Sequence, residues 1–342
     1  MLFRSIIDEP ELYEPVQGKH PLMDSIISQA FPDDEAKAVF LGWLRDGMEA
    51  VRSSLHQPAP MMVLAGEANS GKSLLAFIVS KILGGRSGDP MTAWTGRLPW
   101  NDDILGKELL LIDDSEASTD SRSRRRLGAN FKASIYAKDV KINTRGKTSI
   151  EARPVWRVMI CCNEEPENLS VIPPLDDDIR DKISLLRVSK ITLPMPASSV
   201  SEKEEFRIAL MMEFPAFCYS LQQVVTPEHL QDSRAGVRAW HDRSLLEALN
   251  QIAPEGKLEE LLEIAIQTDS ISTKMFLSAS EIQEALTDQG ARTSSQARSL
   301  LGHHSSQCGS YLKRLHSKGS PYIAERQEGR SRSVTYKLTL PA

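Results

Sequence analysis

The sequence predicts an α/β protein built around a mainly parallel sheet, and three observations support this prediction. Short apolar runs at 61–65, 109–112 and 155–162 alternate with segments whose apolar residues recur at helical spacing. Continuous apolar runs are typical of strands buried on both faces, as in a parallel sheet covered by helices. A glycine-rich loop follows the first run directly, and a basic segment with a pattern of its own ends the chain.

The composition is that of an ordinary soluble protein. A chain of 342 residues is longer than one ordinary domain and suits two or three. Hydrophobic residues make up 41% of it, yet no apolar run is long enough for a membrane span, and the N-terminus lacks the apolar stretch of a signal peptide. The formal net charge of −5 argues against a generally basic surface for nucleic acid. We therefore expect a cytoplasmic protein with no membrane partner.

The four cysteines predict neither a disulfide framework nor a zinc site. Cys161 and Cys162 are adjacent inside an apolar run, and Cys218 and Cys308 stand alone. No pair has the spacing of metal ligands. We expect reduced, buried thiols.

The glycine-rich loop has the complete pattern of a phosphate-binding loop of P-loop NTPases. It consists of Gly66, Glu67, Ala68, Asn69, Ser70, Gly71, Lys72 and Ser73. Its glycines let backbone N–H groups close around phosphate oxygens, and the helix expected at 73–83 directs its positive end at the same anion. Lys72 is expected to reach the β- and γ-phosphates, and Ser73 to ligate Mg²⁺. The loop therefore predicts binding of ATP or GTP.

Two carboxylates end the second apolar run. Asp113 and Asp114 would reach the carboxyl edge of the sheet, beside the phosphates. We expect Asp113 to hold Mg²⁺ and Asp114 to polarise the attacking water. The alternative is an acidic junction between a strand and a loop, with no catalytic role.

Asn163 ends the third apolar run. A neutral amide at this edge can orient the attacking water or contact the γ-phosphate without adding negative charge. The alternative is an asparagine that only forms the turn before Pro166.

The three motifs between Gly66 and Asn163 resemble those of the superfamily 3 helicases of viruses, phages and plasmids. The resemblance covers residues 35–342 and includes the helix at 213–221, which is similar to that of phage and poxvirus-type primase-helicases. It implies an AAA+ ATPase core, a ring that is generally a hexamer, and movement along single-stranded DNA. It also implies the sensor-1 role for Asn163.

The family places a hairpin with a basic tip between the second and third motifs, where it contacts DNA in the central channel. Here strands are expected at 140–144 and 148–152. The resemblance therefore assigns DNA contacts to Arg145 and Lys147 at the tip and to Lys141 on the first strand. The sequence alone would favour an exposed basic turn.

An acidic, proline-rich stretch at 172–183 resembles the segment in which the family carries an arginine that reaches a neighbouring subunit's nucleotide. Lys182 stands where that arginine usually falls. Lysine cannot copy the planar, bidentate donor of arginine. Arg180 is the favoured residue, with Lys182 and Arg187 as alternatives.

The chain is expected to divide into four segments. These are an N-terminal helical segment at 1–57, the AAA+ core at 58–195, a helical linker at 196–245 and a winged-helix domain at 246–342. In the last segment, helices at 278–286 and 309–315 precede a hairpin of alternating strands at 322–325 and 333–338. Its basic loop assigns DNA contacts to Arg330 and Arg332.

These expectations combine into one function with two alternatives. The first is an ATP- and Mg²⁺-dependent DNA helicase or translocase in the replication of a phage, plasmid or other mobile element. It would act as a homo-hexameric ring on single-stranded and forked DNA, with a separate primase or replication partner. One alternative is an ATP-switched initiator or loader that binds DNA without unwinding it. The other is a signalling or defence AAA+ ATPase whose winged helix binds protein.

Overall fold

The structure is a computed structural model, and its chain divides into two compact units, residues 1–246 and 247–342. It describes residues 9–113, 121–146, 148–173, 175, 177–302, 305–329 and 334–341. The division into four segments expected from the sequence stays a prediction.

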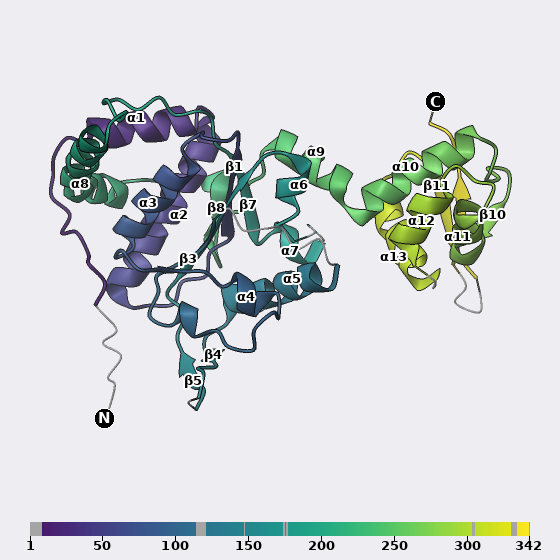
Figure 1. Ribbon diagram of the computed structural model, residues 1–342, viewed down its shortest axis with the longest axis horizontal. Coiled ribbons are helices and arrows are strands. Elements are labelled where there is room, and N and C mark those ends of the chain that lie inside the picture. Colours follow the sequence, from purple (N-terminus) through teal and green to yellow (C-terminus); the bar gives the residue numbers. More distant parts are fainter. Residues whose placement is uncertain are drawn as a thin grey trace. The chain divides into compact units, whose positions relative to one another are not determined.

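A five-stranded parallel sheet forms the centre of the first unit (Figure 1). Its order is β2-β3-β6-β1-β7, and every neighbouring pair is parallel. The strands are β1 (Met61–Gly66), β2 (Ser87–Gly88), β3 (Leu109–Asp113), β6 (Arg157–Asn163) and β7 (Ile183–Arg187). The predicted α/β class and the three predicted apolar strands are confirmed.

Helices cover both faces of this sheet. On one side α1 (Pro21–Ala30), α2 (Asp34–Ser53), α3 (Lys72–Ile82) and α8 (Val200–Gln222) share a hydrophobic core with the strands. On the other side lie α5 (Ser121–Tyr136), α6 (Pro166–Leu169) and α7 (Asp177–Arg180), as Figure 1 shows, with the short α4 (Met91–Trp94) beside α5. Burial on both faces explains why the strands read as continuous apolar runs.

The predicted hairpin between the second and third motifs is present. Its antiparallel strands, β4 (Val140–Ile142) and β5 (Ile150–Ala152), are shorter than predicted and extend away from the sheet (Figure 1). Gly146 lies in the turn with φ +70°, a conformation that favours glycine.

A side chain from outside the hairpin holds its first strand. Asn101, which precedes the short 3₁₀ helix η1 (Asp102–Ile104), donates its backbone N–H to the Asn143 carbonyl (3.1 Å) and its side-chain amide to the Lys141 carbonyl (3.1 Å). Its side-chain oxygen accepts from the Asn143 N–H at 2.6 Å. The Asn101 side chain thus bonds main-chain groups of Lys141 and Asn143, as a neighbouring strand would.

The chain after α8 returns to the sheet. It forms η2 (Glu228–Leu230) and a small hairpin of β8 (Gln231–Asp232) and β9 (Gly236–Val237), and then runs along β7. Leu185 donates its N–H to the Trp240 carbonyl, and Asp242 donates its N–H to the Leu185 carbonyl, both at 2.8 Å. Helix α9 (Arg243–Ile252) begins directly after this contact and spans the boundary between the two units along the chain.

The second unit has a core and a sheet of its own. Its antiparallel sheet has the order β10 (Phe276–Ser278), β12 (Val334–Leu338) and β11 (Ile323–Glu328), which confirms the predicted hairpin. Its helices are α10 (Pro254–Gln267), α11 (Ala279–Thr287), α12 (Ser294–Leu301) and α13 (Ser305–Ser317). Ser278 starts α11 with a reciprocal capping box to Glu281, as expected for a serine before helix-spaced apolar residues.

The cysteines agree with the prediction of buried, reduced thiols. All four cysteines are buried as thiols, and burial raises the pKa of Cys218 to about 11 and that of Cys308 to about 12. In the part of the chain that the structure describes, no helix combines the length and the apolar character needed to cross a membrane.

Candidate nucleotide-binding site

The glycine-rich loop connects β1 to α3 and is closely packed against the segment that follows β7. A Cβ on Gly66 would lie 2.4 Å from the Val188 carbonyl oxygen, so a larger residue would push the two segments apart. Gly71, with φ +107°, is the N-cap of α3. The Ile191 N–H donates to the Ser70 carbonyl at 3.0 Å. These contacts fix the position of the loop against the segment that follows β7.

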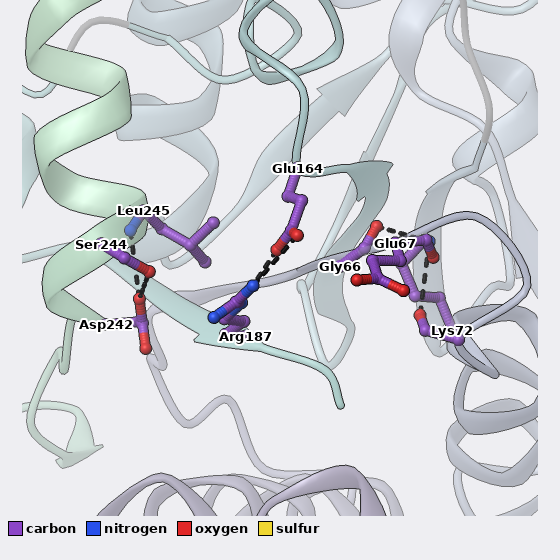
Figure 2. A network of polar contacts seen from close by, with 9 residues as sticks. Gly66, Glu67, Lys72, Glu164, Arg187, Asp242, Ser244 and Leu245 are labelled. Carbon is purple, nitrogen blue, oxygen red and sulfur yellow. Dashed lines mark hydrogen bonds and ion pairs between the residues drawn. The ribbon is translucent and has the colours of Figure 1, made fainter. Parts of the chain in front are cut away.

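Lys72 lies inside this loop and is only 7% exposed. Its ammonium donates to the carbonyls of Gly66 (3.0 Å) and Glu67 (2.8 Å) and to Asn163 Oδ1 (2.9 Å). Figure 2 shows the contacts with Gly66 and Glu67. These acceptors are neutral, so the positive ammonium has no negatively charged partner among them. Phosphate oxygens can replace them and supply that negative charge.

Asn163 reaches Lys72 because of the strand order. β6 lies next to β1, and Asn163 stands in register with Gly66 at the carboxyl ends of the two strands. The structure therefore brings together the loop and the third motif, residues far apart in the sequence.

Ser73 and Asp113 provide oxygen atoms at the same edge. Ser73 is exposed in the first turn of α3, and Asp113 is exposed at the end of β3. A hydroxyl and a carboxylate are ligands that suit Mg²⁺, which takes its remaining ligands from phosphates and water. Within the described ranges, no group of three or more His, Cys, Asp or Glu residues is arranged so that it could hold a metal ion. Asp114 lies outside the described residues.

The three candidates for the trans arginine have different surroundings. Arg180 is exposed at the end of α7. The Lys182 side chain is 12% exposed, pairs with Asp181 at 2.6 Å, and lies 5.8 Å from the centroid of the Tyr136 ring. Arg187 ends β7 in register with Ala65, beside the loop of its own chain.

Arg187 makes a two-point ion pair that the sequence did not reveal. Its Nε and Nη2 donate to the two carboxylate oxygens of Glu164, at 2.8 and 3.0 Å (Figure 2). This hydrogen bonding and the Glu164 charge raise the pKa of Arg187. The sequence offered one signal for this pair, the position of Glu164 directly after Asn163. It could not show that Arg187 is the partner, because that depends on how the strands pair.

Of the residues predicted to contact DNA, the structure describes two. Arg145 is exposed in the hairpin turn, and Lys141 is exposed on β4. Lys147, Arg330 and Arg332 lie outside the described residues. Asn101, which holds β4, was not predicted, because its role depends on contacts made across 40 and 42 positions of sequence.

Comparisons with known proteins give a family model that matches part of the chain and a fold shared with solved structures. A family described as "Family of unknown function (DUF5906)" matches residues 64–180, a range that includes Lys72, Asp113 and Asn163. No match is found among the curated proteins.

Solved structures extend the comparison over nearly the whole chain. An apo structure of the NrS-1 C-terminal region matches with a TM-score of 0.58 and 12% identity, covering 96% of this chain and 77% of that chain. An A-form apo structure of the same region matches with 0.56 and 11%, covering 96% and 78%. JCV helicase, bound to a substituted acetamide, matches with 0.31 and 11%, covering 68% and 65%, too weakly for an inference. The chain therefore shares its fold with the NrS-1 region.

Proposed function

We propose that this protein is an ATP-dependent DNA helicase or translocase of the superfamily 3 type, with an AAA+ core. The observation that supports it best is the position of the Lys72 ammonium, between the loop carbonyls and the Asn163 amide oxygen. A phosphate-binding lysine and a polar side chain from the third motif thus meet at one point of the sheet edge.

Each residue of the site has one role in hydrolysis. Lys72 and the backbone N–H groups of the loop hold the phosphates, and Ser73 and Asp113 hold Mg²⁺. ATP supplies the phosphoryl group, and Mg²⁺ neutralises its charge. Asn163, released by Lys72, orients the attacking water, and Asp114 polarises it.

A neighbouring subunit completes the site in a homo-hexameric ring. Arg180 is the best donor among the three candidates, because it is exposed at the end of α7 while Lys182 and Arg187 bind partners in their own chain. An arginine in this role contributes about 10³–10⁵ to the rate.

The β4–β5 hairpin contacts single-stranded DNA in the ring. Arg145, Lys147 and Lys141 bind phosphates. The Asn101 hydrogen bonds attach the hairpin to the ATPase unit, so a movement of that unit is transmitted to the DNA.

The second unit is a winged helix that binds forked DNA. Three features support this: helices α10 to α13, the three-stranded antiparallel sheet, and the basic connection between β11 and β12. Arg330 and Arg332 contact phosphates there. The protein acts in the cytoplasm, in replication of a mobile element, together with a separate primase.

A strand-displacement assay on forked DNA tests this function. The double variant Arg145→Ala, Lys147→Ala should keep the basal ATP hydrolysis but lose its stimulation by DNA and the unwinding. Lys203→Ala, a change on α8, is a matched control that should unwind normally. Binding to DNA should also weaken steeply with salt.

Other outcomes identify the alternatives. Normal unwinding by the double variant would contradict the hairpin role. ATP hydrolysis that responds to DNA, with duplexes left intact, would indicate an initiator or loader. Hydrolysis without measurable DNA affinity would indicate a signalling or defence ATPase with a protein-binding winged helix.

A further inference from the structure

A row of polar side chains leads from the phosphate-binding loop to the start of α9 (Figure 2). Lys72 donates to Asn163 at 2.9 Å, and Glu164 is the next residue along the chain. Glu164 accepts both hydrogen bonds from Arg187. The row thus crosses the end of β1, from β6 on one side to β7 on the other.

Asp242 continues the row on the far side of Arg187. Its Oδ1 accepts from Ser244 Oγ (2.6 Å) and from the Leu245 N–H (3.0 Å), which makes Asp242 the N-terminal cap of α9. Its own N–H is bonded to Leu185 on β7. After Glu164, the Asp242 charge is a further, smaller cause of the raised pKa of Arg187. The guanidinium therefore has Glu164, directly after β6, and Asp242, directly before α9, in its surroundings, together with Glu67 of the loop.

Phosphate binding has a direct consequence for one end of this row. When phosphate oxygens take the place of the Asn163 oxygen at Lys72, the Asn163 side chain is released, while its backbone stays paired with β1. Glu164 is the next residue, so the released Asn163 side chain changes the surroundings of Glu164. Arg187 follows Glu164, since a two-point ion pair fixes the relative orientation of its partners, and a side chain that is 51% exposed has room to move.

We propose that Arg187 is a positioning residue that transmits the nucleotide state of the loop, through Glu164 and Asp242, to the N-terminus of α9. The inference rests on the proposed nucleotide site but not on helicase activity. Because α9 spans the boundary between the two units along the chain, a change at its first turn alters the connection to the second unit. Arg187 is thereby a link between nucleotide and C-terminal unit, in addition to the predicted trans contact of Arg180.

Hydrogen exchange of the amides at 243–249 tests the proposal. In the full chain, with Mg²⁺ and either ADP or a non-hydrolysable ATP analogue, the wild type should exchange these amides at rates that differ between the two nucleotides. Arg187→Gln should abolish the difference, and Arg187→Lys, which keeps the charge but not the two-point geometry, should reduce it. Nucleotide affinity should stay within about threefold of the wild type, a change of ~0.7 kcal/mol.

A matched control is available on α8. Arg207 makes a similar two-point pair with Glu204, at 2.9 and 2.6 Å, on an exposed surface. Arg207→Gln removes an equivalent ion pair and should leave the α9 difference as in the wild type. Glu164→Gln releases Arg187 from the other side, so α9 should become insensitive to the nucleotide in this variant too, even if Arg187→Gln does not fold.

The outcomes separate this inference from the proposed function. If α9 does not respond to nucleotide in the wild type, or responds fully in Arg187→Gln or in Glu164→Gln, the positioning role is wrong. A loss of nucleotide affinity of more than about tenfold in Arg187→Gln would also overturn it, because Arg187 would then bind the nucleotide itself. If the wild type binds no nucleotide, the proposed function fails as well.

Discussion

Strand β6 begins with a buried arginine, Arg157, and ends beside Lys72 of the glycine-rich loop. The two cations differ in how many hydrogen-bond acceptors surround them. At the first residue, Arg157 is 2% exposed and donates Nη1 to the Gln57 carbonyl at 2.9 Å. Its Nε and Nη2 are buried and have no hydrogen-bond partner among the described residues. Burial lowers the pKa of Arg157 to about 10, although Asp46 acts in the opposite direction. At the other end, Asn163 and the loop carbonyls surround the Lys72 ammonium with acceptors.

The difference assigns a role in stability to one end of β6 and, in the proposed function, a role in nucleotide binding to the other. Arg157 is enclosed by packing, since a Cβ on Gly47 would lie 3.0 Å from its Cγ. Removing a side chain enclosed in this way would leave a cavity in the core. The acceptors of Lys72 lie at the open edge of the sheet, where a ligand can take their place. Variants at the two ends should therefore affect different properties.

Lys72→Ala should have the largest effect, reducing ATP hydrolysis below detection because no other cation lies inside the described part of the loop. The free energy of unfolding should change little by comparison. Steady-state phosphate release measures the first property and urea unfolding the second. Lys81→Ala, on the last turn of the same helix, is the control and should hydrolyse ATP normally. Hydrolysis by Lys72→Ala at the wild-type rate would contradict the site.

Arg157→Ala should have the opposite profile. Removing the side chain leaves a cavity and takes away one of the two cations near Asp46, which keeps its ion pair with Arg45, so the free energy of unfolding should fall by ~3 kcal/mol. Arg157→Met keeps most of the volume and should lose less. Nucleotide affinity should remain normal in both variants below their unfolding transitions. Unchanged stability of Arg157→Ala in urea would mean that the buried cation is not fixed by its packing.

Asn163→Ala should have the smallest effect of the three. Lys72 retains its two carbonyl acceptors and can still bind phosphates, but the attacking water loses its orienting group. We expect kcat to fall about tenfold to a hundredfold, ~1.4–2.7 kcal/mol, with nucleotide affinity nearly unchanged. Asn168→Ala, which removes an exposed bond to Glu165, is the control. A weaker affinity with unchanged kcat would assign Asn163 to binding instead.

The parts of the fold that could be predicted depend on local sequence. The loop, β1 and α3 are consecutive, so a short pattern determines all three, and the apolar runs of β3 and β6 stand out because both sheet faces are covered. β7 was missed because the fully buried Ser184 interrupts its apolar residues. Its hydroxyl is satisfied by accepting from the Trp240 N–H at 3.2 Å, a residue 56 positions away.

The site was predictable only where a motif places a residue. Asn163 is the last residue of its strand, and its contact with Lys72 then depends only on β6 lying beside β1. The Glu164–Arg187 pair also needs β7 on the other side of β1, and the Asn101 contacts need the hairpin to fold back onto the segment before η1. Such contacts result from the arrangement of elements, which periodicity does not encode.

The segment Trp240–Asp242 along β7 has one more consequence. A strand at the border of a sheet exposes unpaired N–H and C=O groups, to which a strand of another chain can add. Trp240 and Asp242 take up both main-chain groups of Leu185, and at the opposite border β2 is only two residues long. Strand addition is thereby discouraged at both borders, so in the proposed ring the subunits would contact one another through side chains and not through a shared sheet.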